Sequence, residues 1–280
     1  MRTLRDAIFG LAIGDALGVP AEFKRRGTFQ IKDMIGYGTH NQPSGTWSDD
    51  TSMTIATCDS VKRKGHIDYS DIMDCFHEWY FSGAYTADGT VFDIGNTTFE
   101  AINRYHNGKE PINCGISSVR ANGNGSLMRI LPLAFIECTE KEIRNVSKLT
   151  HAHEISQKAC CIYVDIAKRL LNGESVKDIL MSLAYNSPFN RLQLLGPLPE
   201  AAIQSSGYVV HTLEAALWCV VNTNTFEQCV LKAVNLGDDT DTTAAVAGGL
   251  AGIIYGYGNI PGAWIKKLRN KEVIENTLFI

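Results

Sequence analysis

Two stretches of this sequence place acidic residues in tight clusters directly before apolar, helix-forming residues. The first is "WSDDTSMTIAT", residues 47–57, and the second is "LGDDTDTTAAVAGG", residues 236–249. One acid at a helix start is stabilised by the free N–H groups there by about 0.3–1 kcal/mol. Two carboxylates about 4 Å apart repel each other by roughly 4 kcal/mol at an effective dielectric constant of 20. Helix capping therefore explains one acid in each cluster, whereas a bound cation would explain all of them.

The side chains available to such a cation offer only oxygen, with no cysteine or histidine in either stretch. Oxygen ligands favour Mg²⁺, Mn²⁺ or Ca²⁺ over zinc. A calcium-binding EF-hand loop starting at Asp239 would need Gly at 244 and Glu at 250, but Ala244 and Leu250 stand there. "DTDTT" also fits the Asp-x-Asp-x-Thr pattern of haloacid dehalogenase-like phosphatases, an alternative that the sequence leaves open. The preceding residues favour a helix, however, where those phosphatases need a strand. The candidate ligands are Ser48, Asp49, Asp50, Asp239, Asp241 and Thr242.

Other stretches hold polar residues that could bind or react with a substrate. "RANGNGSLMRILPLA", residues 120–134, alternates Asn and Gly before an apolar segment expected to be helical. Backbone N–H groups at such a start can bind phosphate, although a plain turn explains the pattern equally well. Asp93 precedes a Gly-Asn turn and a helix, where a helix cap is the simpler interpretation. His151 follows a helix end, where a solvated or C-capping histidine is usual. Glu22, taken alone, is typical of a surface acid.

Helical periodicity accounts for most of the remaining sequence. Apolar residues recur at helical spacing from Leu4 to Ala12, so the N-terminal segment predicts a core helix rather than a signal sequence. Convincing alternating strands are absent, and residues 30–47 and 186–207 lack any period and are expected to be loops. We therefore predict an all-α fold with a single domain over residues 1–280. The other expected helices are "SDIMDCFHEWYF" from Ser70, "TEKEIRNVSKL" from the Thr139–Glu142 capping pair, "EISQKACCIYVDIAKRLLNG" ending at Asn172-Gly173, "TLEAALWCVVN", "TFEQCVLKAV" from the Thr225–Gln228 pair, and "PGAWIKKL" with Pro261 first.

The composition is that of a soluble globular protein. The 280 residues are 45% hydrophobic and 20% charged, and the net charge of −4 gives no electrostatic reason to expect a nucleic-acid or anionic-membrane partner. No apolar run approaches the roughly 20 residues that span a membrane. The eight cysteines lack CxxC spacing and fall mostly in apolar segments, which indicates buried reduced thiols. These observations predict a cytoplasmic protein, and we expect a monomer.

Taken together and in this order, these stretches resemble the ADP-ribosylglycohydrolase family over roughly residues 4–258. The similar blocks are "GLAIGDALGVPAEF", "WSDDTSMT", "FDIGNTT", "NGNGSLMRILPLA", "TH", "GYVVHTLEAALW" and "LGDDTDTTAAVAGGLAG". The resemblance implies a compact, orthogonal multi-helix bundle with two Mg²⁺ or Mn²⁺ ions in a cleft. It also implies hydrolysis of the bond between ADP-ribose and an acceptor, with protein arginine as the expected acceptor. The partner would be an ADP-ribosylated protein or a small ADP-ribosyl conjugate.

The same resemblance assigns expected roles to individual residues. Ser48, Asp49 and Asp50 would be one set of metal ligands, and Asp239, Asp241 and Thr242 the other. Asp238 stands where many relatives have glycine, so no role is assigned to it. The residues implicated in catalysis are Glu22 and Asp93; those expected to contact ADP-ribose are Gly123, Asn124, Gly125, Ser126, His151 and Tyr208. The alternative is a non-catalytic ADP-ribose-binding or crystallin-like member of the same fold, which has no reason to retain so many mutually repelling acids.

Overall fold

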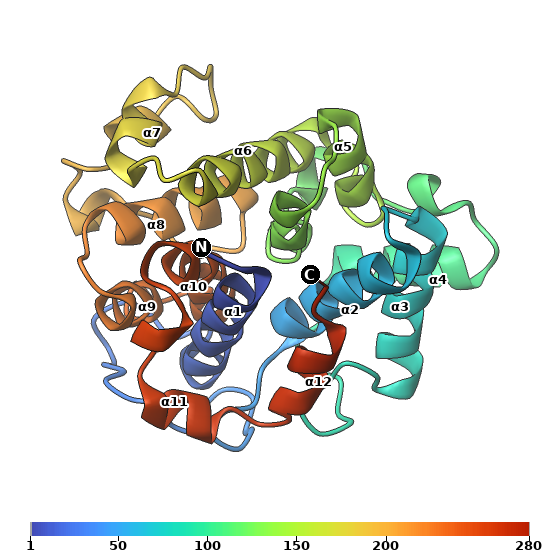
Figure 1. Ribbon diagram of the computed structural model, residues 1–280, viewed down its shortest axis with the longest axis horizontal. Helices are drawn as coiled ribbons and strands as arrows, with labels where there is room; N and C mark the ends of the chain where they lie inside the picture. Colours follow the sequence, from blue (N-terminus) through green and yellow to red (C-terminus); the bar gives the residue numbers. More distant parts are fainter. Residues whose placement is uncertain (1, 280) are drawn as a thin grey trace.

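The regular secondary structure of the chain is helical, and long loops connect several of the helices, as Figure 1 shows. The computed structural model describes residues 2–279, and within them no strand longer than an isolated bridge occurs. The all-α prediction is therefore confirmed. The α-helices of the described chain are α1 (Leu4–Gly18), α2 (Asp49–Lys64), α3 (Tyr69–Ser82), α4 (Asn96–His106), α5 (Glu140–Lys148), α6 (Glu154–Leu171), α7 (Val176–Ser182), α8 (Val209–Val221), α9 (Phe226–Val234), α10 (Thr240–Tyr255), α11 (Gly262–Lys267) and α12 (Lys271–Thr277).

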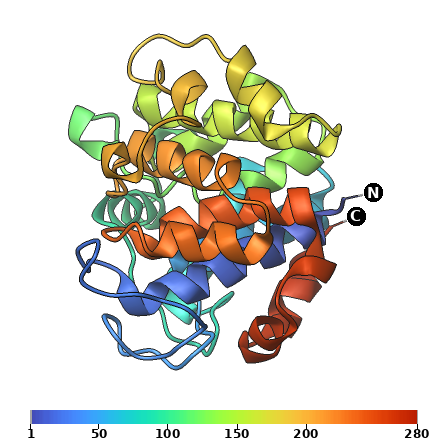
Figure 2. The same cartoon turned by 90° about the vertical axis from the view of Figure 1, so that its left-hand side faces the viewer.

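Helices α1 and α10 approach each other more closely than ordinary side chains allow. In Figures 1 and 2 they run side by side through the middle of the molecule. A Cβ atom on Gly14 of α1 would lie 2.0 Å from the carbonyl oxygen of Ala244 in α10. A Cβ atom on Gly18 would lie 2.3 Å from the Cα atom of Asp241. Only glycine fits at such backbone contacts. The two glycines therefore bring the C-terminal half of α1 against the first turn of α10, where the second acidic cluster lies.

Helix α2 carries the first acidic cluster, and local signals set both of its ends. The Oγ of Ser48 accepts the N–H of Asp50 at 3.3 Å, and Gly65 ends the helix with a φ of 73°. The first turn is acidic and the last turn is basic, which complements the helix dipole at both ends. Helix α2 packs against α1, α3, α10 and α12. Its acidic first turn is therefore held at the junction of several helices.

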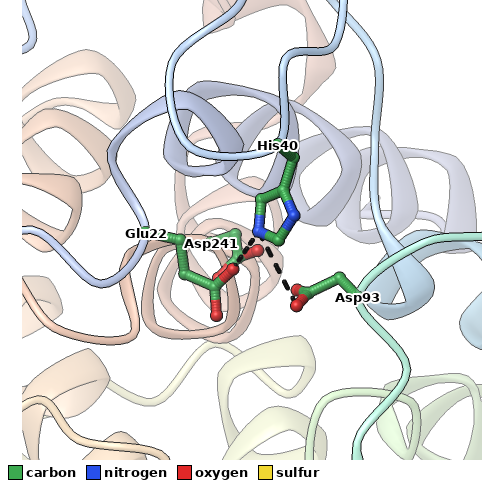
Figure 3. A group of neighbouring side chains, drawn as sticks. All are labelled: Glu22, His40, Asp93 and Asp241. Carbon is green, nitrogen blue, oxygen red and sulfur yellow. Dashed lines mark hydrogen bonds and ion pairs between the residues drawn. The ribbon is translucent and has the colours of Figure 1, made fainter.

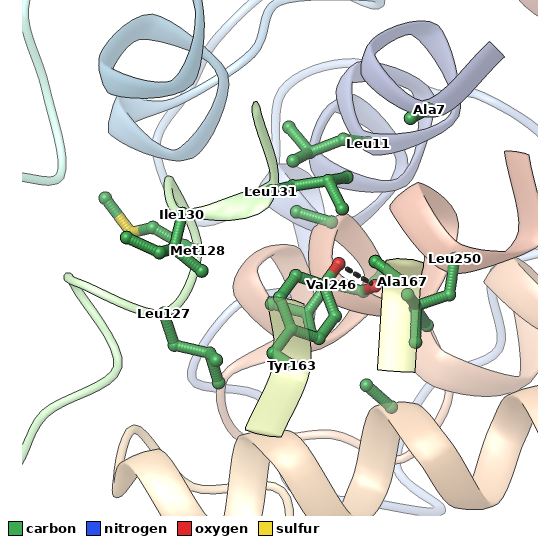
Figure 4. Packing of buried hydrophobic residues seen from close by; sticks show 14 of the residues in the cluster. Ala7, Leu11, Leu127, Met128, Ile130, Leu131, Tyr163, Ala167, Val246 and Leu250 are labelled. Carbon is green, nitrogen blue, oxygen red and sulfur yellow. Dashed lines mark hydrogen bonds between the residues drawn. The ribbon is translucent and has the colours of Figure 1, made fainter. Parts of the chain in front are cut away.

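The hydrophobic core includes side chains packed between α1, α6 and α10 (Figure 4). Leu11 of α1 and Leu250 of α10 are fully buried together with Tyr163 of α6. The Tyr163 hydroxyl donates a hydrogen bond to the carbonyl oxygen of Val246 at 2.8 Å, so its one polar atom is satisfied inside the core. Burying a leucine side chain such as that of Leu11 or Leu250 stabilises a fold by about 1.5–3 kcal/mol. Helices α1 and α10, which carry acids of the site, are thus packed together by apolar side chains.

Both expected capping pairs form, one of them in a modified way. Thr139 and Glu142 make a complete capping box at the start of α5. At the start of α9 the Thr225 Oγ1 accepts the N–H of Gln228 at 3.1 Å. The Gln228 Oε1 accepts the N–H of Asn224 at 3.1 Å instead of that of Thr225. The Gln228 side chain therefore bonds to the residue before the N-cap, and not to the N-cap itself.

Three helix starts and one apolar segment differ from expectation. Helix α8, expected from Thr212, begins three residues early at Val209. Helix α3 begins one residue early, at Tyr69, with Asp68 as its N-cap. Pro261 is the N-cap of α11 rather than its first residue. The apolar segment after the glycine-rich stretch forms a short 3₁₀ helix, Leu131–Phe135, instead of an α-helix. The residue that follows it, Ile136, is extended, which ends the 3₁₀ helix after five residues.

The aperiodic segments and the cysteines have the structure that the sequence predicts. Residues 30–47 form a loop, and residues 186–207 are non-helical apart from the 3₁₀ turns Leu192–Leu194 and Glu200–Ala202. All eight cysteines are free thiols; seven are buried and Cys138 is half-buried. Among the described residues, no helix combines the length and hydropathy that crossing a membrane requires.

Candidate active site

The acidic first turns of α2 and α10 meet, although about 190 residues separate them in the sequence. The Asp50 Oδ2 accepts hydrogen bonds from Ser48 Oγ at 3.0 Å and from Thr242 Oγ1 at 3.2 Å. Carboxylate oxygens of Asp15, Asp50 and Asp241 all lie within 4.8 Å of one another. The two clusters therefore form one acidic centre, with a third carboxylate from the last turn of α1.

A second group of ionisable side chains adjoins this centre (Figure 3). Side-chain atoms of Glu22, His40, Asp93 and Asp241 lie within 4.8 Å of one another. The His40 Nε2 contacts a Glu22 carboxylate oxygen and lies 3.7 Å from Asp93 Oδ1. Asp241 belongs to both groups, so the two candidate catalytic acids stand beside the candidate metal ligands.

Residues in the left-handed conformation lie at or next to several acids of the site. Glu22 follows directly after α1 and the 3₁₀ turn Val19–Ala21. The next residue, Phe23, has a φ of 62°, Asp93 has a φ of 60° and Asp238 has a φ of 58°. Such left-handed conformations cost non-glycine residues free energy and are often found at functional sites. The turns after Glu22 and before Asp239 also bond to each other, because the Phe23 N–H donates to the Asp238 carbonyl oxygen at 2.7 Å.

A cleft of about 470 Å³ opens beside the acidic side chains. Its lining brings together acids at the helix starts and the glycine-rich stretch. The lining residues include Glu22, Asp49, Asp93, Asp239, Thr242, Gly123, Asn124, Gly125 and His151. Ser48, Asp50 and Asp241 lie beneath the acidic part of the lining, where they are buried. Asp238 is exposed and belongs to neither acidic group.

Burial and mutual repulsion shift the pKa of these carboxyls upward. Burial, followed by the charge of Asp239, raises the pKa of Glu22 to about 8. Burial and the charge of Glu22 raise the pKa of Asp93 to about 8 as well. The pKa values of Asp50 and Asp241 are raised well above the usual aspartate range, again by burial first and neighbouring carboxylates second. Without a cation the folded centre therefore favours bound protons over charge.

Asp15 differs from its neighbours because it is well supplied with hydrogen-bond donors. It is fully buried, and burial raises its pKa to about 6. Its Oδ2 accepts the Thr51 Oγ1 hydroxyl at 2.6 Å and the Thr51 N–H at 3.0 Å, and its Oδ1 accepts the Ser48 N–H at 2.9 Å. Asp15 thus ties the start of α2 to α1.

The donor set of the centre fits one or more divalent cations. Asp50 Oδ1, Asp239 Oδ1 and Asp241 Oδ2 are buried, and no hydrogen bond reaches them within the described chain. A buried carboxylate oxygen without a donor is costly unless a cation neutralises it. The atoms that could coordinate a cation are oxygens, except for the His40 nitrogen. A ligand set made mainly of oxygen favours Mg²⁺, Mn²⁺ or Ca²⁺. The acidic centre is therefore compatible with metal binding.

The glycine-rich stretch forms the other wall of the cleft and is itself bonded to the acids. The Asn124 Nδ2 donates to Asp239 Oδ2 and to Thr212 Oγ1, both at 2.9 Å. A Cβ atom on Gly125 would lie 2.8 Å from His151 Cε1 and 3.0 Å from Thr98 Oγ1, so the His151 ring packs directly on this loop. Because residue 125 is glycine, the His151 imidazole can pack against the backbone of the loop, and both line the same wall of the cleft.

Two of the residues expected to contact ADP-ribose lie off the cleft lining. Ser126 is fully buried beneath the loop, where its Oγ accepts a hydrogen bond from Ser147 Oγ at 3.1 Å. Tyr208 is half-buried and its backbone pairs with that of Gly123. His151 does line the cleft and is buried rather than solvated, because the ring lies against the loop. In this structure the Ser126 side chain packs beneath the loop, and the Tyr208 backbone pairs with it.

Asp15 and His40 belong to the site but were not singled out from the sequence. Asp15 carries a signal that could have found it, since a charged residue stands inside an apolar helical face where a partner is required. His40 lies in the aperiodic loop of residues 30–47, and nothing local distinguishes it. Only the folded chain brings it to Glu22.

Comparison with known proteins agrees with this geometry. The family described as ADP-ribosylglycohydrolase matches residues 2–279. This chain belongs to the ADP-ribosylglycohydrolase family. It is 36% identical to ADP-ribosylarginine hydrolase Tri1 of Serratia proteamaculans, over 97% of this chain and 76% of that protein. It is 34% identical to ADP-ribosyl-[dinitrogen reductase] glycohydrolase of Rhodospirillum rubrum, over 95% and 90% of the two chains.

A solved structure extends the match to three dimensions. A protein described as an ADP-ribosylglycohydrolase-related protein complex superposes with a TM-score of 0.84 and 31% sequence identity, covering 98% of this chain and 94% of that one. The acidic centre and the glycine-rich wall thus lie in a fold of the ADP-ribosylglycohydrolase type, and the relatives support an ADP-ribosyl hydrolase activity.

Proposed function

We propose that this protein is a metal-dependent hydrolase that releases ADP-ribose from modified arginine side chains. One observation carries the proposal. Two distant acidic helix starts and a glycine-rich loop line a single cleft in a member of the ADP-ribosylglycohydrolase family. The relatives named for ADP-ribosylarginine and for ADP-ribosyl-dinitrogen reductase support ADP-ribosylated protein as the partner.

The acids at the two helix starts would hold two Mg²⁺ or Mn²⁺ ions. The proposed ligands are Ser48, Asp49, Asp50, Asp239, Asp241 and Thr242. When bound, such ions supply Lewis-acid chemistry and offset the repulsion among the carboxylates. Asn124 would keep Asp239 in place through its 2.9 Å hydrogen bond.

Glu22 and Asp93 would handle the proton of the reaction. Hydrolysis needs one group to take a proton from the attacking water and another to give a proton to the leaving nitrogen. Burial and proximity raise the pKa of each carboxyl to about 8 in the metal-free protein, so both can hold a proton, and a cation bound beside them would favour its release. Both carboxyls are candidates for the acid and for the base.

The charge of the cleft suits a cationic acceptor. Its lining includes the carboxylates of Glu22, Asp49, Asp93 and Asp239, against a single arginine, Arg120. A guanidinium leaving group would be attracted to these acids, and the positive charge that builds on the sugar ring in the transition state would be stabilised by them. The glycine-rich wall offers backbone N–H groups to the pyrophosphate, and this distant binding helps to orient the reacting sugar.

The test is release of ADP-ribose from arginine-linked and serine-linked protein substrates measured side by side. We expect the arginine-linked substrate to be cleaved and Asp241→Asn to lose more than about a thousandfold in rate. Asp178→Asn, which changes an exposed carboxylate of α7 outside the cleft, is the matched control and should keep full activity. Cleavage of only the serine-linked substrate would refute the arginine assignment, and an active Asp241→Asn variant would refute the acidic centre as the site.

A further inference from the structure

Arg129 is a buried cation whose role the acidic site does not explain. Its side chain is fully buried and lies over the Phe76 ring, with the guanidinium carbon 4.7 Å from the ring centroid. Its Nη2 donates to Thr150 Oγ1 at 2.8 Å and to the Val146 carbonyl oxygen at 3.4 Å. No ion pair with a carboxylate forms within residues 2–279. A buried charge held by neutral groups is expensive, so its position calls for a reason.

Thr150 connects this cation to His151. Its Oγ1 lies 2.8 Å from Arg129 Nη2 and 2.8 Å from His151 Nδ1. Arginine can only donate, so the Thr150 oxygen must accept from Arg129. The single hydroxyl proton is then free to be donated to His151 Nδ1. If Nδ1 carried a proton instead, the buried hydroxyl proton would have no acceptor among the described residues.

The same count of donors and acceptors determines the tautomer of the His151 imidazole. With Nδ1 accepting, the neutral ring carries its proton on Nε2. Burial and the nearby Arg129 lower the pKa of His151 to about 3, which agrees with a ring that stays neutral. The Nε2 side of the ring faces the glycine-rich wall: Cβ atoms on Gly123 and Gly125 would lie 3.5 and 3.4 Å from it. His151 also lines the cleft, so the Nε2–H is available to a bound ligand.

We propose that Arg129 and Thr150 are positioning residues that hold His151 as the Nε2–H tautomer, so that it donates a hydrogen bond to an oxygen of the bound ADP-ribose. The identity of the ligand rests on the proposed function, whereas the tautomer rests on the hydrogen bonds alone. A neutral donor suits this place because a charged imidazole would repel cations held by the acids across the cleft. The guanidinium stands behind Thr150, where it polarises the hydroxyl without reaching the ligand.

The first measurement is a long-range ¹H–¹⁵N correlation spectrum of protein labelled with ¹⁵N-histidine. The His151 signals are assigned by their loss in His151→Gln. We expect the Nε2–H pattern in the wild-type protein from pH 5 to pH 8. An Nδ1–H pattern, or a ring that gains a second proton in this range, would overturn the proposal. This result does not depend on any variant of Thr150 folding or on the protein binding ADP-ribose.

The second measurement compares Thr150→Val with Thr150→Ser. Valine removes the hydroxyl at nearly constant shape, so we expect a mixed tautomer population and a loss of roughly tenfold in ADP-ribose affinity by calorimetry. On substrate, KM should rise by about the same factor with kcat nearly unchanged. Serine keeps the hydroxyl and should restore both the tautomer and the affinity. An unchanged tautomer and affinity in Thr150→Val would refute the positioning role.

A matched control separates this effect from the general loss of a buried hydroxyl. Thr277 is buried in α12 and donates to the Ile274 carbonyl oxygen at 2.8 Å, outside the cleft. Thr277→Val should leave the His151 tautomer and the ADP-ribose affinity at wild-type values; if it alters them as Thr150→Val does, the specific relay is refuted. If the wild-type protein binds no ADP-ribose at all, the proposed function fails, while the tautomer measurement still decides the relay by itself.

Discussion

Replacing Asp241 by asparagine should make the metal-free protein more stable, although most changes at a fully buried residue destabilise a fold. The Asp241 side chain is fully buried and belongs to both acidic groups. Its Oδ1 accepts the N–H of Thr242 at 2.9 Å, and an asparagine oxygen can accept the same bond. The change therefore removes charge while keeping the shape and the hydrogen bond.

The size of the effect follows from the distances within the groups. Two unit charges 4.8 Å apart, the outer limit within either group, interact by about 3.5 kcal/mol at an effective dielectric constant of 20. A proton can relieve the repulsion, but holding that proton at pH 8 costs free energy of similar size. We therefore expect Asp241→Asn to gain about 3 kcal/mol in the free energy of unfolding at pH 8 without metal. For a chain of this length, that corresponds to a rise in Tm of roughly 5 °C.

The pH dependence gives the sign of the effect independently. Folding raises the pKa of Asp15 to about 6 and that of Glu22 and Asp93 to about 8. A carboxyl whose pKa is raised by folding stabilises the fold fully below its unfolded pKa and loses that contribution as the pH rises through the folded value. The Tm of the metal-free wild type should thus fall between pH 5 and pH 9, and the gain in Asp241→Asn should shrink at pH 5.

The assay is thermal unfolding in EDTA and in Mg²⁺ at pH 5 and pH 8. Mg²⁺ should stabilise the wild type at pH 8 far more than it stabilises Asp241→Asn, because the ion binds the folded state and needs this carboxylate. A variant less stable than the wild type in EDTA at pH 8 would refute the reasoning. So would a wild-type Tm that does not fall with rising pH.

Four further substitutions test the wall of the cleft, the proton-transfer pair and the contact between helices α1 and α10. Gly125→Ala should weaken ADP-ribose binding severalfold by calorimetry, because the new Cβ would stand 2.8 Å from His151 Cε1; an unchanged affinity would remove this loop from the binding site. Glu22→Gln and Asp93→Asn should each lower kcat by about a hundredfold or more and each abolish one limb of the pH–rate profile, and a variant that keeps both limbs is not part of the pair. Gly14→Ala should destabilise the fold by about 2–3 kcal/mol in urea unfolding, since its Cβ would meet the Ala244 carbonyl oxygen at 2.0 Å; wild-type stability would show that the glycine contact is not needed.

The sequence predicts those parts of the site that depend on local physics. Ser48 and the acids after it form a helix start because side-chain oxygens there satisfy free N–H groups, and the structure places the start of α2 there. The second cluster likewise stands at the start of α10, with Asp239 as the N-cap residue, although its side chain makes no capping hydrogen bond. Excess negative charge at both starts also indicates a cation, since repulsion among adjacent acids does not depend on the rest of the fold.

The parts that sequence reasoning missed depend on long-range packing. Asp15 lies in an otherwise apolar helix, and only the approach of α2 reveals the hydrogen-bond donors of its carboxylate. His40 reaches Glu22 through a loop whose path no periodicity encodes. Ser126 stands in a loop that lines the cleft, yet its own side chain turns inward, which depends on the packing of the loop against Ser147.

Crystals soaked in Mn²⁺ and measured near the manganese absorption edge would test the central claim most directly. The account predicts anomalous peaks in the cleft about 2–2.5 Å from carboxylate oxygens of Asp50 and Asp241, and none there in crystals of Asp241→Asn. An empty acidic centre in soaked wild-type crystals, or manganese bound only elsewhere on the protein, would contradict it.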